Sequence, residues 1–410
     1  MTRQSVLSRN LLAYLASRFA TASATMMLRA GIAWHVFAIT GSAFHLGLIG
    51  LVQFLPALAL ALVGGALADG YDRRRIMMAA QLVGLACGAV LCVTTVRHTV
   101  TLPLLYGMIT VVAAAGAFDS PARMALLPSL VGREAFPRVV TLASTNQALA
   151  FAAGPAVGGL LIASAGIGAL YAAYTALLLG SLVALPLLRP GAQERVGRPL
   201  SLAVIREGLR FVRRQPVVLG CMTLDMFAVI FGGATALLPI YATDILQVGP
   251  RGYGLLTSSL EIGALVTSLV LIGIPPIRRP GRALLAAVGV YSMATIAFGL
   301  SRWFPLSVAT YMLVGIADQV SVVMRSTAIQ LSTPDELRGR VSAVNMLFIG
   351  ASNQLGAAES GFVAALTSAP FAVVSGGVGS LLVLAIVAAR VPALRRYRID
   401  HGEWVTTRRR

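Results

Sequence analysis

The dominant feature of the sequence is a series of long apolar blocks separated by short polar connections. A helix needs roughly 20 consecutive apolar residues to cross a lipid bilayer, and blocks of this length recur along almost the whole chain. A soluble protein can bury one such block in its core but not a dozen. We therefore predict an all-α integral membrane protein with twelve transmembrane helices. Their expected ranges are 12–40, 43–67, 76–97, 102–122, 139–165, 168–188, 216–242, 253–275, 283–300, 306–330, 341–366 and 370–390.

The longest connection divides the predicted helices into two sets of six. It covers residues 189–215 and separates an N-terminal six-helix bundle (1–188) from a C-terminal one (216–390), which a basic tail (391–410) follows. Its second part, SLAVIREGLRFVRRQP, places apolar residues on one helical face and arginines mainly elsewhere. This pattern predicts an amphipathic helix, which either lies on the membrane surface or links the two bundles in solvent.

The two halves also resemble each other. The segment RMALLPSLVGREAFPR (123–138) aligns without a gap to RSTAIQLSTPDELRGR (325–340), at an offset of 202 residues. The same offset maps Arg123 onto Arg325. A parallel repeat of six helices is one of the major architectures of membrane transporters.

The basic residues report on orientation. The chain has 33 Lys and Arg residues against 15 Asp and Glu, and all of the basic ones are arginines. All but five lie in the termini, in the even-numbered loops or in the helix ends beside them; the exceptions are Arg18, Arg29, Arg97, Arg251 and Arg302. The positive-inside rule then predicts that both termini are cytoplasmic. Because the arginines form no continuous basic face, we expect no nucleic-acid partner.

Residue types that carry enzyme chemistry are sparse. The three cysteines lie inside apolar blocks without metal-ligand spacing, and the four histidines are dispersed. We find no nucleotide-binding loop and no Ser/His/Asp set in the sequence. We therefore expect no enzyme activity, no cofactor and no metal.

One loop motif indicates a transporter family. The segment GALADGYDRRR (65–75), between the second and third predicted helices, resembles the loop pattern of the major facilitator superfamily at Asp69, Arg73 and Arg74. Asp72 replaces the second glycine of that pattern. The resemblance implies that Asp69 faces the start of the eleventh helix, near Val341, where the helix dipole stabilises a carboxylate by about 0.3–1 kcal/mol. Such a contact would latch an inner gate; the alternative is an ordinary turn with solvated charges.

A second motif lies in the outer half of the fifth predicted helix. The segment GPAVGG (154–159) resembles the antiporter motif of the same superfamily. Pro155 bends the helix, and Gly154, Gly158 and Gly159 form a small-residue face for close packing. In exporters of the superfamily this face meets helix eight, so we expect a role in gating. Glycine-mediated packing alone explains the residues equally well.

Two further segments, FDSPARMALLPSLV (118–131) and STPDELRGRVSA (332–343), resemble the branch that contains bacterial enterobactin exporters and macrolide efflux proteins. The resemblance covers essentially the whole chain. It implies a major facilitator fold, namely two pseudo-symmetric six-helix bundles around a central cavity, and a monomer. It is specific for the fold and the branch.

Charged residues inside membrane helices are costly, so each is a candidate for function. The carboxylates Glu359, Asp318, Asp225 and Glu261 are candidates for proton coupling, and Arg29 could alter their proton affinity by moving relative to them. Arg29 could instead bind a phenolate or carboxylate of the substrate. Other cavity candidates are Trp34, Gln53, Asn146, Gln147, Asn353 and Gln354, although polar residues of this kind more often join helices.

We therefore predict a secondary transporter in a bacterial inner membrane. It would export a small amphipathic molecule by alternating access, in exchange for protons, with a siderophore favoured as substrate. Multidrug or macrolide efflux is the next alternative. A lipid flippase, an importer or a non-transporting scaffold remain open.

Overall fold

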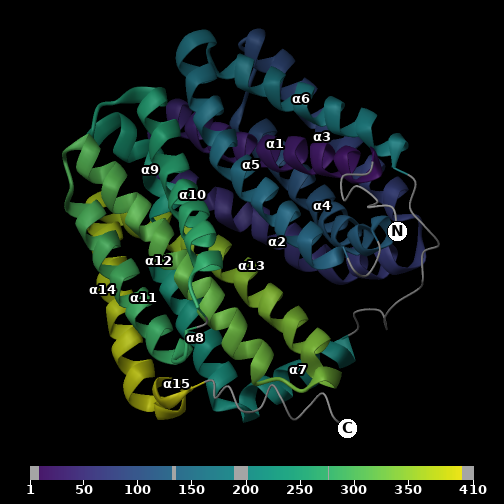
Figure 1. Ribbon diagram of the computed structural model, residues 1–410. Coiled ribbons are helices and arrows are strands. Elements are labelled where there is room, and N and C mark those ends of the chain that lie inside the picture. The colour runs from purple at the N-terminus through teal and green to yellow at the C-terminus, as the bar shows by residue number, and fades with distance from the viewer. Residues whose placement is uncertain (1–8, 132–134, 189–201, 276, 399–410) are drawn as a thin grey trace.

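The computed structural model describes the backbone of the chain except residues 1–8, 132–134, 189–201, 276 and 399–410. Among the remaining residues, it describes all side chains except those of 57, 61–70, 137 and 202–205. Within this part the secondary structure is helical throughout, and the chain forms two bundles (Figure 1). The N-terminal bundle comprises α1 (Arg9–Thr40), α2 (Ala43–Gly70), α3 (Arg73–Val96), α4 (Leu102–Leu126), α5 (Phe136–Ala165) and α6 (Ile167–Ala184). The C-terminal bundle comprises α8 (Pro216–Phe231), α10 (Gly249–Gly273), α11 (Pro280–Leu300), α12 (Phe304–Leu331), α13 (Asp335–Leu366) and α14 (Ala369–Arg390).

The structure confirms the predicted all-α membrane fold. Eleven helical segments of the described chain are long and apolar enough to span a membrane. The twelfth spanning helix, α13, is equally long but more polar, because it carries charges in its first turns and amides further along. It begins at Asp335 rather than near Val341, since the acidic residues after Pro334 extend its N-terminus favourably for the helix dipole.

The predicted spanning segment 216–242 is confirmed as a candidate span, Pro216–Ile245, but it is not one continuous α-helix. The regular helix α8 ends at Phe231, and the chain continues through a 3₁₀ turn (Ala234–Leu237), the short α9 (Leu238–Ile240) and a π-helical turn (Tyr241–Ile245). The break falls at Gly232 and Gly233, where the backbone passes close to Tyr291 and to the carbonyl of Gly356. Side chains at these two positions would collide, so the glycines permit an approach that the hydrophobic pattern does not reveal.

The amphipathic helix of the central connection is present as α7 (Leu202–Arg214). It packs on α13, with Gly208 against the backbone of Arg340 and an ion pair between Glu207 and Arg340. Val212 is buried in the same contact. The described part of the apolar face of α7 is therefore covered by protein rather than by lipid or solvent.

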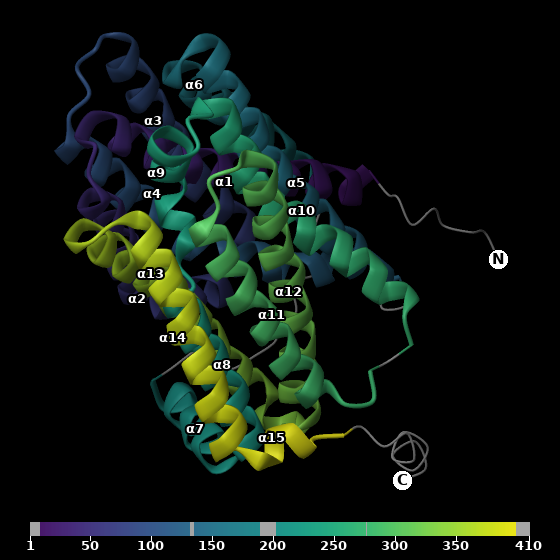
Figure 2. The same ribbon diagram turned by 90° about the vertical axis from the view of Figure 1, so that its left-hand side faces the viewer.

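Both α7 and the short α15 (Pro392–Arg396) lie at one end of the C-terminal bundle (Figure 2). Since α7 carries four arginines and α15 two, we call this end of the molecule the basic end and the other the opposite end. The two bundles meet mainly through α5 against α10 and α2 against α13.

Candidate functional site

A cavity of about 940 Å³ lies between the N-terminal bundle and α13. Residues from all six helices of the N-terminal bundle line it, whereas the C-terminal bundle contributes residues of α13 alone. Its volume falls within the range typical of small-molecule sites. The bundle interface thus forms a cavity as predicted, but most of its wall comes from the N-terminal bundle.

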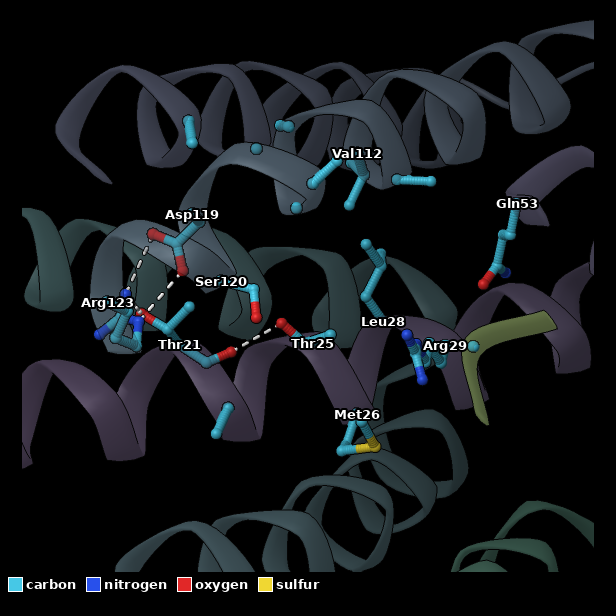
Figure 3. Close-up of a pocket in the computed structure, with 18 of the residues that line it drawn as sticks. Thr21, Thr25, Met26, Leu28, Arg29, Gln53, Val112, Asp119, Ser120 and Arg123 are labelled. Carbon is cyan, nitrogen blue, oxygen red and sulfur yellow. Dashed lines mark hydrogen bonds and ion pairs between the residues drawn. The ribbon is translucent and has the colours of Figure 1, made fainter. Parts of the chain in front are cut away.

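The wall formed by α1 follows a single helical stripe. Positions three or four apart share a face of a helix, and the cavity-lining residues of α1 keep this spacing, with three adjacent pairs among them. They are Arg18, Thr21, Ala22, Thr25, Met26, Leu28, Arg29 and Ile32, several of which appear in Figure 3. This face places two arginines of one membrane helix in the same cavity.

Two of the three arginines in the cavity are held by neighbouring side chains. Arg123 pairs with Asp119 on its own helix at 3.0 Å from Nε to Oδ2 (Figure 3), and it also donates to Ser17 and Thr21 of α1. Arg18 donates to Tyr14 and Gln147. We did not predict a site at Asp119 and Arg123, although their i, i+4 spacing at the end of an apolar block was a usable signal.

Arg29 differs from these two. Its side chain is exposed to the cavity although it lies deep in the molecule. Within the described chain it has no hydrogen bond and no ion pair within 4 Å, and its electrostatic partner is Glu261 of α10. Five guanidinium N–H donors therefore lie at a cavity wall without a bound acceptor.

The interface is closed at the opposite end by backbone contacts between glycines. A Cβ on Gly159 of α5 would lie 2.7 Å from the Cα of Gly254 of α10. A Cβ on Gly47 of α2 would lie 3.0 Å from the Cα of Gly361 of α13. Next to the second contact, Gln354 donates to Gln53 at 3.5 Å across the interface, and both line the cavity. The cavity thus lies on the basic side of a closed interface.

The other glycines of the GPAVGG motif pack inside the N-terminal bundle. A Cβ on Gly154 would lie 2.6 Å from the carbonyl oxygen of Ser23 in α1, and one on Gly158 would lie 3.1–3.2 Å from Leu170 and Met27 side-chain carbons. The carbonyl of Pro155 faces Gly254 of α10. The motif therefore joins α5 to α1 on one side and to α10 on the other, while its role in gating stays a prediction.

None of the four predicted proton-coupling carboxylates lines the cavity. Asp225 forms a buried ion pair with Arg325 of α12. Glu261 of α10 and Asp318 of α12 interact electrostatically with each other, and their helices are in close contact where Gly315 meets Leu260. Glu359 accepts a hydrogen bond from the neighbouring Ser360 at 3.3 Å.

The predicted cavity residues fall into two groups. Arg29, Gln53, Gln147 and Gln354 line the cavity. Trp34, Asn146 and Asn353 do not: Trp34 packs on Tyr253 with ring centroids 5.2 Å apart, Asn146 donates to the carbonyl of Leu15, and Asn353 to that of Ile349. The sequence identifies polar residues in helices, but the rotation of each helix decides which of them face the cavity.

The loop motif between α2 and α3 is partly described. The side chain of Asp69 lies outside the described residues. Arg73 donates to the carbonyl of Ala125 at 2.8 Å and Arg74 to that of Leu188 at 2.8 Å, so both join helices within the N-terminal bundle. Asp72 accepts from the N–H of Arg74 and caps α3. The residue that replaces the family glycine thus begins a helix.

No cluster of three or more potential metal ligands occurs in the part of the chain that the structure describes. Two six-helix bundles with a cavity at their interface form the fold of the major facilitator class. Solved transporters share the fold: a peptide transporter of the POT type has a TM-score of 0.73 at 13% identity, covering 95% of each chain. The nucleoside transporter NupG has a TM-score of 0.73 at 12% identity, covering 92% of this chain and 99% of its own.

The sequence matches the family described as transmembrane secretion effectors over residues 5–403, and the chain belongs to this family. It is similar to the enterobactin exporter EntS of Shigella boydii, with 27% identity over 369 residues covering 88% of this chain and 83% of the relative. The corresponding protein of Escherichia coli O1:K1 is 28% identical over 370 residues, with the same coverage. The chain is therefore a multi-pass membrane transporter of the branch that contains EntS, and not an enzyme.

Proposed function

We propose that this protein is a secondary active exporter that moves a small amphipathic molecule across a bacterial inner membrane by alternating access. The observation that carries the proposal is the cavity at the bundle interface, which is closed at one end and exposes Arg29. A siderophore is the favoured substrate, because relatives over most of the chain are named enterobactin exporters. The protein would act as a monomer, without nucleic acid.

The basic end would face the cytoplasm. Arginines are retained on the cytoplasmic side of membrane proteins. Arginines occur in α7, in α15 and at the start of α3, and the order of the helices places all three on the same side of the membrane. Both termini would then be cytoplasmic. In this orientation the cavity lies on the cytoplasmic side of the closed glycine contacts, as an exporter needs in order to load its substrate.

Export would be coupled to proton entry. Carboxylates in a membrane interior are suited to carry protons, since their proton affinity depends strongly on burial and on nearby charge. Glu261 interacts with Asp318 and Arg29, so it links the C-terminal bundle electrostatically to the cavity. Glu359, Asp318 and Asp225 remain further candidates.

Two elements would govern opening and closing. Close contact between α5 and α10 at Gly159 would seal the outer end. Asp69, with Arg73 and Arg74 holding the start of α3 in place, would latch the inner end against α13 once the bundles rock together. Both roles follow from the motifs and their position along the chain.

Multidrug or macrolide efflux is the second candidate, and the apolar surface that α13 presents to the cavity favours it. A flippase, an importer or a scaffold has less support, because none of them requires Arg29 to be exposed at a closed-ended cavity.

The test of the proposal is transport in proteoliposomes that contain only this protein. Secreted siderophores and amphipathic drugs are supplied on the side of the basic end, and substrate and proton movements are followed together. Substrate movement that drives proton movement in the opposite direction supports the proposal. Transport that persists unchanged without a pH gradient or a membrane potential contradicts proton coupling.

A further inference from the structure

The two walls of the cavity differ in charge. All of its charged lining residues belong to the N-terminal bundle, and three arginines against one aspartate leave two positive charges in excess. These residues are Arg18, Arg29, Asp119 and Arg123. The facing wall is apolar apart from one amide: it consists of Ala343, Met346, Leu347, Gly350, Ala351 and Gln354.

The positive charges are not equally available to a ligand. The Asp119 carboxylate already neutralises Arg123, and Tyr14 and Gln147 accept from Arg18. Arg29 makes no such bond within the described chain, and Glu261, with which it interacts, lies outside the cavity lining. A bound anion would satisfy guanidinium donors that the protein leaves open.

Arg29 also lies deeper in the cavity than Arg18. Arg18 and Arg29 lie on the same face of α1, and their separation of eleven residues corresponds to about 16 Å along the helix. Arg29 is the deeper of the two when counted from the basic end, and the Gln53–Gln354 contact lies toward the closed end. An anion that enters from the basic end meets Arg18 and Arg123 before it reaches Arg29.

We propose that the cavity selects amphipathic anions, whose carboxylate or phenolate group binds Arg29 while their apolar face packs on Met346 and Leu347 of α13. This inference rests on the proposed function, because it takes the cavity to be the substrate site. It adds the charge of the substrate and its orientation between the two walls. It also assigns separate roles to the two bundles, with charge recognition on α1 and apolar contact on α13.

The test uses two probes of equal size, a fluorescent naphthalene carboxylate and its primary carboxamide, with purified full-length protein in nanodiscs. A hydrogen bond to a charged group contributes about 1.5–3 kcal/mol, so the carboxylate is expected to bind at least about tenfold more tightly than the amide. Arg29→Gln removes this difference while amide binding stays unchanged, which shows that the cavity is intact. Arg29→Lys retains part of the difference. The matched control, Arg251→Gln, alters an exposed arginine outside the cavity and leaves both affinities unchanged.

The apolar wall is tested separately. Met346→Gln is expected to weaken both probes by a similar factor, whereas Met293→Gln, at an exposed position of α11 outside the cavity, changes neither. Equal affinity for the two probes, no binding of either probe, or an unchanged preference in Arg29→Gln would each overturn the inference. Anion-selective binding without any export by the intact protein would contradict the proposed function alone. Export of neutral or cationic compounds without anion preference would contradict the inference alone.

Discussion

Asp225 of α8 and Arg325 of α12 form a buried ion pair, and Arg325 is the repeat counterpart of Arg123 in the other bundle. Arg123 is paired as well, but with Asp119 of its own helix. Each half of the repeat thus contains a buried, paired arginine. The acidic partner lies on the same helix in the N-terminal half and on another helix in the C-terminal half. Only the N-terminal pair lines the cavity, which leaves the C-terminal pair as a link between α8 and α12.

The Asp225–Arg325 pair is expected to stabilise the C-terminal bundle against loss of either partner. Breaking a buried ion pair by removing one charge typically costs about 3–5 kcal/mol. Asp225→Asn is therefore expected to lower the melting temperature of the detergent-purified protein, and Asp225→Asn combined with Arg325→Met is expected to recover most of the loss. An unchanged melting temperature in the single variant would show that the pair is not a structural link.

Close packing of α5 on α10 is expected to be needed for transport. Gly159→Ala introduces a Cβ 2.6 Å from the carbonyl oxygen of Pro250, so the two bundles cannot close fully at the opposite end. The matched control is Gly180→Ala in α6, where no atom lies within 4 Å of the new Cβ. We expect transport to fall at least about tenfold in the first variant, since small residues permit such close helix contacts, and to persist in the second. Equal activity of both variants would exclude a sealing role for Gly159.

Asp69 is expected to act in gating rather than in folding. Asp69→Asn removes the charge that the dipole at the start of α13 would stabilise. Its expression and melting temperature should match those of the wild type, while its transport rate falls. The comparison is made in proteoliposomes with equal amounts of inserted protein, and turnover at the wild-type rate would contradict the latch.

Docking of α7 on α13 is expected to depend on Gly208. A Cβ at this position would lie 2.7 Å from the carbonyl oxygen of Arg340. Gly208→Val should therefore loosen α7 and speed tryptic cleavage after Arg210 and Arg213. Gly107→Val, at a position with no atom within 4 Å, serves as the control. Cleavage at the wild-type rate would mean that the Glu207–Arg340 ion pair and the burial of Val212 suffice to hold α7.

Much of the fold is predictable because the bilayer imposes a simple rule on each helix. Length and hydropathy identify eleven of the spanning helices in the described chain. The more polar α13 does not meet that hydropathy criterion, but the sequence still places it between its neighbours. The sequence does not predict the interruption after Phe231, because the apolar residues continue through the break. What ends the helix there is the approach of α11 and α13 to Gly232 and Gly233, and such long-range contacts leave no periodic signal.

The site is less predictable, because hydropathy does not determine helix rotation. The carboxylates of the second half attract attention as intramembrane charges, yet Glu261 and Asp318 lie outside the cavity lining. Asp119 and Arg123 do line it, although they lie near a predicted helix end and resemble ordinary loop charges in the sequence. Arg29 is the predicted charged residue that does line the cavity, since an intramembrane arginine needs a partner and the structure leaves its donors open to the cavity.

Export of a small amphipathic molecule is tested most directly by comparing the metabolites of a wild-type strain and a deletion strain, in cells and in medium, with and without iron. We expect one small amphipathic metabolite to fall in the medium of the deletion strain and to accumulate in its cells, most strongly under iron limitation. Complementation with the wild-type gene restores secretion, whereas the Arg29→Gln gene does not. Identical metabolite profiles of the two strains under both conditions would contradict the account.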